Sequence, residues 1–316
     1  MTGKTNLRQG KTTRRVLAGK RLTRLPKFPL AAVAGQRSAV ASSPLLSQCF
    51  RFGHEFAKNR ELLKLVTAYY AFFGIAAAVL VGGVLVNSGT SLLGGKASLS
   101  TVIAQFGGLV LAGTVLLVLF AIAGLWVNSF MTATAGQLLK KGKFDLQQSK
   151  AIASNRFVAV LGVALLSVVA SFAVSPLAEA IGMVGGKVLA SIVDFIFSLA
   201  VSLALLYAPF EAVLHNRGAF SAVRSSIARF GSRPLQTALL FVGELAVLAL
   251  AAIVALLAVV FAILFAAAAF GALGAGLPAV LVAVILGALA FSFLLSCLAF
   301  ATQFSVGLIA CAVEAN

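Results

Sequence analysis

The sequence predicts an all-α integral membrane protein in which six transmembrane helices form three hairpins, each preceded by an amphipathic surface helix. The chain is 61% hydrophobic and only 10% charged, whereas a soluble domain carries about 25% charged residues. Apolar segments of spanning length follow one another, and Lys and Arg gather in alternate connections between them. With a mean hydropathy of +1.06, most of the chain has lipid as its solvent.

The placement of the basic residues predicts the topology. The chain has 25 Lys and Arg against eight acids, a formal charge of +17. They lie at or before Lys64, within Lys140–Arg156 and within Arg217–Arg233, apart from Lys96 and Lys187 in the intervening loops. This alternation follows the positive-inside rule, which places both termini in the cytoplasm of a multi-pass plasma-membrane protein. The charge is thereby explained without a nucleic-acid partner.

The chain divides into a basic tail, residues 1–41, and a transmembrane domain, residues 42–316. The tail has many Lys and Arg, no acid and little apolar periodicity. One interpretation is a disordered cytoplasmic tail held at anionic lipid, where each basic residue contributes about 1 kcal/mol near the surface. The other is a cleaved presequence, because such segments are Arg-rich and acid-poor; the protein would then lie in an organellar inner membrane.

Six segments have the length and apolar character of membrane spans. A crossing needs about 20 apolar residues, and segments near or above that length are Leu62–Val86, Val102–Ser129, Phe157–Val174, Val188–Tyr207, Leu235–Phe270 and Leu277–Val313. Backbone polar groups must be paired within lipid, so each span is predicted to be helical. The last two segments exceed one crossing and must tilt, break or extend beyond the bilayer.

An amphipathic stretch precedes each predicted hairpin. In the first stretch, which begins at Ser43-Pro44, the apolar residues on one face are Leu45, Cys49, Phe52 and Phe56. In the second, which begins at a capping box of Asp145 and Gln148, they are Leu146 and Ile152. In the third, they are Phe220, Val223, Ile227 and Phe230. Helices of this kind settle at the lipid headgroups. The alternative is that they are cytoplasmic extensions that pack on each other.

The three stretches align as copies of one unit when Arg60, Arg156 and Arg233 are superposed. Each Arg stands at a predicted entry into the membrane, where a long cationic side chain can reach lipid phosphate. We therefore predict these residues to be interface anchors. The bilayer itself, with anionic lipid at the cytoplasmic face, is the predicted partner.

Two cytoplasmic segments resemble those of a broad prokaryotic family. The runs TATAGQLLKKGKFDLQQSKAIASNRFVAVLGVALL (Thr132–Leu166) and YAPFEAVLHNRGAFSAVRSSIARFGSRPL (Tyr207–Leu235) are similar to recurring segments of YciC-like proteins and of the membrane domain of some glycerophosphoryl diester phosphodiesterases. The resemblance implies a six-helix membrane fold over about Leu45–Asn316. It brings no catalytic residue, because hydrolysis in the fused proteins belongs to a separate soluble domain.

Motif searches predict neither an enzyme nor a cofactor or metal site. The Gly-Gly-Lys runs before Lys96 and Lys187 lack the spacing and the preceding strand of a phosphate loop. The cysteines show no C-x-x-C spacing, and no structural disulfide is expected, because Cys49 is predicted to be cytoplasmic and Cys297 and Cys311 fall within the last span. His54 and His215 lie beside surface helices with few acids nearby, so a Ser-His-Asp arrangement would need an acid from across the bilayer.

Polar residues inside the predicted spans form the candidate site. Asp194 and Glu244 fall toward the middle of the bilayer, where a charged carboxylate costs at least about 2.5 kcal/mol, so both should face the bundle. Tyr69 and Tyr70 are possible hydrogen-bond partners. Ser171 and Ser198 lie on serine stripes of the third and fourth spans. The stripes indicate either interhelical hydrogen bonding or a path for a proton or solute.

These features predict a non-enzymatic polytopic membrane protein that acts as a membrane- or lipid-associated scaffold or binding protein. The alternative is a small-solute or proton-coupled transporter with a site between the hairpins. The transporter predicts a wet central cavity at Asp194 and Glu244, whereas the scaffold predicts that a peptide of the tail and first surface helix binds liposomes in a manner that weakens steeply with salt.

Overall fold

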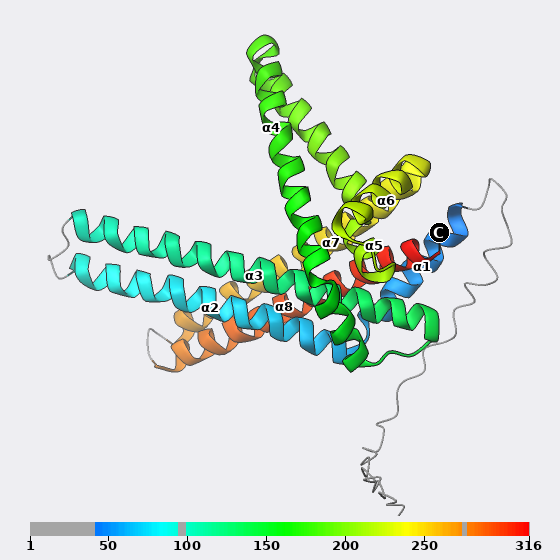
Figure 1. Cartoon of the computed structure of the whole chain (residues 1–316). Helices are drawn as coiled ribbons and strands as arrows, with labels where there is room; N and C mark the ends of the chain where they lie inside the picture. Colours follow the sequence, from blue (N-terminus) through cyan, green and yellow to red (C-terminus); the bar gives the residue numbers. More distant parts are fainter. Residues whose placement is uncertain (1–41, 94–98, 274–276, 316) are drawn as a thin grey trace, which may run out of the picture.

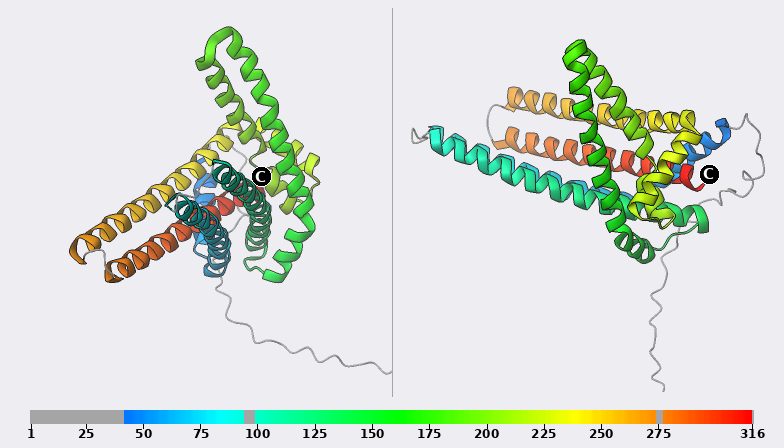
Figure 2. Two further views of the ribbon diagram at one scale, coloured as in Figure 1. Left: turned by 90° about the vertical axis from the view of Figure 1, so that its left-hand side faces the viewer. Right: turned by 45° about the horizontal axis from the view of Figure 1, so that its top comes forward.

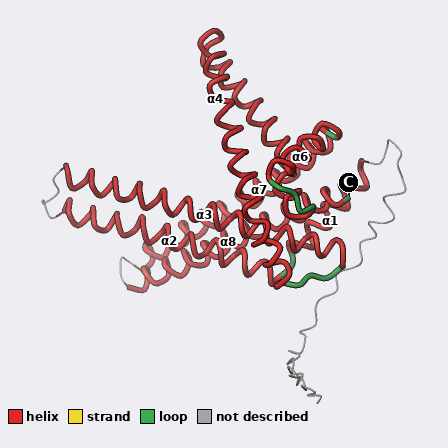
Figure 3. The backbone as a smooth tube through the Cα atoms, in the orientation of Figure 1, coloured by secondary structure: helices red, strands yellow, loops and turns green. Residues whose placement is uncertain are grey.

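The computed structural model describes residues 42–93, 99–273 and 277–315, and most side chains between residues 81 and 106 fall outside that description. In these ranges every regular element is an α-helix and no strand occurs (Figure 3). The helices are α1 (Ser42–Ala57), α2 (Arg60–Leu93), α3 (Leu99–Lys141), α4 (Leu146–Leu205), α5 (Ala208–Leu214), α6 (Ala219–Ser232), α7 (Pro234–Leu273) and α8 (Leu277–Glu314). The predicted tail, residues 1–41, lies outside the described residues.

Five stretches of the described residues are long and apolar enough to cross a membrane: Val110–Lys141, Leu146–Ala173, Gly186–Leu214, Pro234–Ala272 and Leu281–Glu314. They indicate a multi-pass membrane protein, as the composition predicts. The remaining predicted span, Leu62–Val86, belongs to α2, whose far end lacks described side chains. Six spans therefore remain a prediction, as do the particular membrane and the side on which the termini lie.

The two long C-terminal segments are continuous helices. α7 has 40 residues and α8 has 38, which corresponds to about 60 Å each at 1.5 Å per residue. That is about twice the thickness of the hydrocarbon core. Of the alternatives left open by hydropathy, a break within either helix is excluded, and each must tilt or extend beyond the bilayer.

Three pairs of helical segments extend from a common body (Figures 1 and 2). α2 packs beside α3, α7 packs beside α8, and α4 folds back on itself at Gly186. The backbone of Gly186 has φ 82° and ψ 167°, a conformation that residues with a Cβ rarely adopt. The arms of α4 stand apart from the other pairs, while α1, α5 and α6 gather where the pairs meet (Figure 1). We call this meeting region the surface-helix end.

The helix pairs expose apolar side chains along much of their length. Phe172 and Phe195 on the two arms of α4 are 72% and 67% exposed, and Leu256 on α7 is 63% exposed. Contiguous apolar surface of this extent is unfavourable in water and is covered by lipid tails in a bilayer. The exposure therefore agrees with a membrane environment for the pairs.

The main core lies at the surface-helix end and contains the apolar stripe of α1. Cys49, Phe52 and Phe56 are almost fully buried and belong to the same core cluster as α8 residues such as Leu308. The expectation that this first stripe faces the headgroups is therefore wrong, and the alternative of helices packing on each other applies. The prediction failed because the apolar face of an amphipathic helix can pack equally well in a groove of the protein and at the lipid headgroups.

The second predicted surface helix is not a separate element, because it is continuous with the first arm of α4. Asp145 caps its start, with the carboxylate accepting a hydrogen bond of 2.9 Å from the Gln147 amide. The predicted reciprocal bond from Gln148 is absent, since the Asp145 amide donates to Gln137 Oε1 at 2.9 Å. The prediction that Asp145 caps the helix is confirmed, but the predicted capping box with Gln148 does not form.

The third predicted surface helix is α6, which is separate and turns part of its apolar stripe outward, since Phe220 and Ile227 are exposed whereas Val223 and Phe230 are half-buried. Its small residues Ala222 and Ser226 are buried, whereas Phe220 is 79% and Ile227 is 50% exposed. This orientation suits a helix that lies on lipid. Contact of α6 with a membrane surface remains a prediction.

The three anchor residues occupy two kinds of position. Arg60 begins α2 directly after α1, and Arg233 separates α6 from α7. Arg156 instead lies inside the unbroken helix α4. In the predicted repeat, a junction between two helices is therefore present at Arg60 and Arg233 and absent at Arg156.

Candidate functional site

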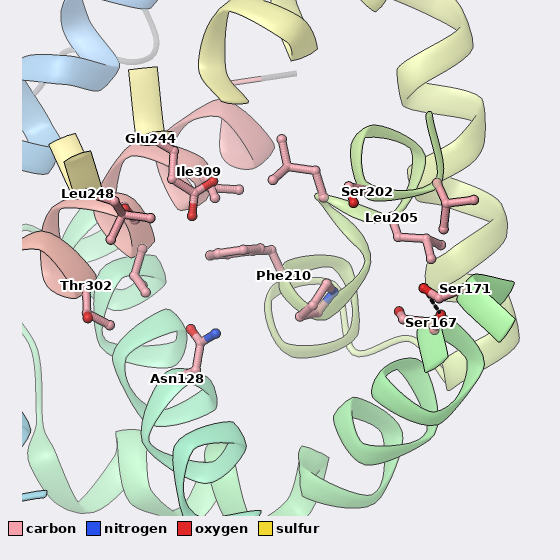
Figure 4. Close-up of a pocket in the computed structure, with 15 residues that line it drawn as sticks. Asn128, Ser167, Ser171, Ser202, Leu205, Phe210, Glu244, Leu248, Thr302 and Ile309 are labelled. Atoms are coloured by element: carbon pink, nitrogen blue, oxygen red, sulfur yellow. Dashed lines mark hydrogen bonds between the residues drawn. The ribbon is translucent and has the colours of Figure 1, made fainter. Parts of the chain in front are cut away.

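A partly open cavity of about 480 Å³ lies where α3, α4, α5, α7 and α8 approach one another. Its walls mix aliphatic and polar side chains (Figure 4), and the polar ones are Asn128, Ser167, Ser171, Ser202, Glu244, Thr302 and Ser305. Glu244 is ten residues from the start of α7, about 15 Å along the helix. The cavity therefore sits inside the span, toward the surface-helix end.

Two of the four predicted polar residues line this cavity and two do not. Glu244 and Ser171 are among its lining side chains. Asp194 and Ser198, on the second arm of α4, are exposed and lie outside it. The prediction that both acids face the bundle is thus wrong for Asp194. The reason is that this part of α4 extends away from α7 and α8 (Figure 1). Of the second arm, only residues of its last turns, such as Val201 and Leu205, line the cavity.

The predicted hydrogen-bond partners of the acids are engaged elsewhere. The Tyr69 hydroxyl donates to the Phe120 carbonyl at 2.7 Å, and the Tyr70 hydroxyl lies 2.9 Å from Thr302 Oγ1. Glu244 makes no hydrogen bond or ion pair within the described part of the chain. Its carboxyl group is therefore available to a ligand.

The described serines of the stripes, Ser175 being outside this description, make no hydrogen bond between helices. Ser167, Ser171 and Ser202 each donate to the carbonyl four residues earlier in α4, at 2.9, 3.0 and 2.8 Å. Such bonds occupy the hydroxyl proton and leave oxygen lone pairs free. The expected interhelical serine bonds are absent here, and the cavity instead gains acceptor atoms.

Two buried polar atoms at the cavity lack a hydrogen-bond partner among the described residues. These are Asn128 Oδ1 on α3 and Ser305 Oγ on α8. Leaving a buried acceptor unsatisfied costs about 1–3 kcal/mol. Both residues line the cavity, but these two atoms are themselves covered by protein, so a polar group in the cavity reaches them only after their side chains rotate.

The short helix α5 forms one wall of the cavity. It follows Tyr207, carries Pro209 in its first turn, where a missing amide proton costs little, and has seven residues. Phe210 is buried and projects its ring into the space that Glu244 and Asn128 also face (Figure 4). α5 thus supplies the aromatic element of the site.

Glu211, the neighbour of Phe210, is fully buried and contacts two guanidinium groups and one imidazole. Its carboxylate lies 2.6 Å from Arg229 Nη2 on α6, 2.8 Å from His215 Nδ1 and 3.4 Å from Arg217 Nη1. Arg229 also donates to the Val313 carbonyl of α8 at 3.3 Å. We call Glu211, His215, Arg217 and Arg229 the Glu211 cluster, and it ties α5 to α6 and α8.

Sequence reasoning missed Glu211, although a signal was present. Glu211 and His215 are spaced four residues apart, which places them on one helix face. The argument that an acid for His215 must come from across the bilayer is therefore wrong. No Ser or Cys is a hydrogen-bond partner of His215 among the described contacts, so the pair does not form a nucleophilic triad.

Two of the cysteines, one predicted in the cytoplasm and one in the last span, lie side by side. Cys49 Sγ on α1 lies 2.9 Å from Cys311 Sγ on α8, and both thiols are free and buried. The hydrogen bond with Cys311 and burial raise the pKa of the Cys49 thiol above its usual range. Among the described residues, no group of three or more His, Cys, Asp or Glu could hold a metal ion.

A second, shallower hollow of about 290 Å³ lies on the outside of α6. It is lined by Ser225, Ala228, Arg229, Ser232 and Arg233. Its hydroxyl and guanidinium groups have the chemistry that contacts lipid phosphate. The predicted anchor Arg233 thus shares a surface with part of the Glu211 cluster.

None of the protein-family models, curated proteins or solved structures compared with this chain matches it. The resemblance to YciC-like proteins therefore remains a prediction. Function has to be argued from the cavity and the Glu211 cluster.

Proposed function

We propose that this protein is a non-enzymatic, lipid-binding membrane protein that receives the polar part of an amphiphile in the cavity at Glu244. The observation that carries the proposal is a cavity of about 480 Å³ with a carboxyl group inside an apolar span. Ligand pockets commonly have this size and combine apolar walls with a few polar groups.

The surroundings of the cavity favour an amphiphile over a fully polar solute. Val201, Leu205 and Leu248 contribute apolar wall. The arms of α4 stand apart from the other pairs (Figure 1). They expose apolar side chains such as Phe172. A polar group in the cavity would leave its acyl chains beside apolar surface, which is favourable at about 25 cal/mol per Å² buried.

The wider proposal retains the predicted architecture of three hairpins and six spans with both termini in the cytoplasm. Under this topology the surface-helix end contacts the cytoplasmic headgroups. The exposed Phe220 and Ile227 of α6 would enter the headgroup boundary. Arg233, Arg60 and Arg156 would attract anionic lipid there, a role in membrane organisation that is separate from the cavity.

Filling the cavity should remove a bound lipid. In Ser171→Trp the indole occupies lining volume, so we expect lipid retained per protein after purification in mild detergent to fall about tenfold, a change of about 1.4 kcal/mol. Ser198→Trp is the matched control, since Ser198 is on the same helix but outside the cavity. Quantitative mass spectrometry of extracted lipid makes the measurement. Equal retention by both variants would exclude the cavity as the binding site.

A small-solute or proton-coupled transporter is the second candidate. Glu244 in a cavity favours it, because intramembrane acids line proton and ion routes. Asp194 weakens it, because the second acid is outside the cavity. Proton-driven uptake into proteoliposomes that is lost in Glu244→Gln but kept in Asp194→Asn would support transport. Uptake equal to that of empty liposomes would remove this candidate.

A further inference from the structure

We infer that the cavity recognises a primary ammonium group, with the Glu244 carboxylate as its counter-ion and the Phe210 ring beside it. The inference deepens the proposed lipid-binding function and rests on it. It is carried by the balance of hydrogen-bond donors and acceptors in the lining, by the aromatic wall and by the size of the cavity.

The lining offers mainly acceptor atoms. Ser167, Ser171 and Ser202 have their hydroxyl protons committed to carbonyls of α4, so their oxygens can only accept. Thr302 donates to the Leu298 carbonyl at 2.8 Å, and its oxygen receives the Tyr70 hydroxyl. A ligand rich in N–H donors matches these oxygens.

The unpartnered groups point to the same ligand. Asn128 Oδ1 is an acceptor without a partner among the described residues, and Glu244 adds a carboxyl group. Asn128 and Ser305 retain some donor capacity through the amide nitrogen and the hydroxyl. A phosphate needs several donors or a cation, and no Lys or Arg lines this cavity among the described residues. The phosphate of a lipid is thus not the group that the cavity selects.

The charge of Glu244, the ring of Phe210 and the volume of the cavity also favour an ammonium ligand. A carboxylate inside a span is least costly when it is paired with a cation. The buried Phe210 ring, which shares the central space with Glu244 in Figure 4, attracts a cation through its negative face. A volume of about 480 Å³ far exceeds that of a bare metal ion, so an organic ammonium fits better.

The test compares lipids that differ only in the headgroup. Wild-type protein in nanodiscs is offered phosphatidylethanolamine, phosphatidylcholine or phosphatidylglycerol of identical acyl chains, and native mass spectrometry counts the retained lipids. We expect about tenfold preference for phosphatidylethanolamine over either other lipid. We also expect the preference to fall to about twofold or less in Glu244→Gln. Asp194→Asn is the matched control, an intramembrane acid outside the cavity, and should keep it.

A second arm separates a lipid headgroup from a free amine. Ethanolamine added at millimolar concentration displaces the retained lipid if the ammonium alone is sufficient, and leaves it bound if the whole headgroup is needed; both results support ammonium recognition. Retention without headgroup preference, or a preference that survives Glu244→Gln, overturns the inference while leaving lipid binding intact. Equal retention of phosphatidylcholine also overturns it, because a quaternary ammonium has no N–H donor.

Discussion

Replacing Glu211 by alanine should lower the free energy of unfolding by about 3–5 kcal/mol, the usual effect of removing one partner from a buried ion pair. Without Glu211, the guanidinium of Arg229 is left largely buried, 16% exposed, with no carboxylate. α5 also loses its tie to α6. The measurement is equilibrium unfolding in detergent micelles or steric trapping in bicelles.

The control for Glu211 is another glutamate in an ion pair. Glu61 lies 3.9 Å from Lys64 on the surface of α2, with both side chains mostly exposed. Exposed pairs contribute about 0–1 kcal/mol, so Glu61→Ala should change stability little. In addition, Glu211→Ala combined with Arg229→Met should recover part of the loss, since the largely buried guanidinium of Arg229 is then removed, while Arg217, whose side chain is 41% exposed, can turn to solvent. Equal stability of Glu211→Ala and Glu61→Ala would show that the Glu211 cluster is not the tie described here.

The second large effect concerns the crossing of α1 and α8 at two glycines. A Cβ on Gly307 would lie 3.0 Å from Gly53 Cα and 3.1 Å from Phe56 Cβ. Overpacking of this kind costs about 1–3 kcal/mol, and here backbone blocks relief. Gly307→Leu should therefore release α1 from α8.

Disulfide trapping reports this release. Because their Sγ atoms are 2.9 Å apart, Cys49 and Cys311 should form a disulfide with a strong thiol oxidant such as diamide, which accepts the two electrons and two protons. We expect the yield in Gly307→Leu to fall about tenfold, as a cost of about 1.4 kcal/mol implies. Gly287→Leu, on the same helix with open space around its Cβ, should keep the wild-type yield. Efficient trapping in Gly307→Leu would contradict the packing of α1 on α8.

A structural feature can be predicted from this sequence when it depends on residues that are close together along the chain. Apolar length predicts the long helices well, because every backbone group in lipid must be paired within its own segment. It does not predict how the helix pairs diverge. Asp194 and Glu244 give the same signal, an acid in an apolar run, and only the tertiary arrangement separates them.

The remaining misses have comparable physical causes. The stripe of α1 is buried against α8, whereas Phe220 and Ile227 of the α6 stripe are exposed, because amphipathicity does not distinguish a protein partner from lipid. The sequence does not single out Glu211, because an acid at the end of a span near basic residues is expected to be solvated. Its importance comes from Arg229, eighteen residues later.

Photocrosslinking can show whether an amphiphile occupies the cavity at Glu244. A phosphatidylethanolamine with a diazirine in its acyl chain is irradiated in nanodiscs, and the adducts are located by peptide mass spectrometry. We expect adducts on Leu248 and Ile309, which line the cavity, although Ile309 is only 3% exposed. Adducts confined to lipid-facing residues such as Leu250, which is 62% exposed, with none on Ile309, would contradict it.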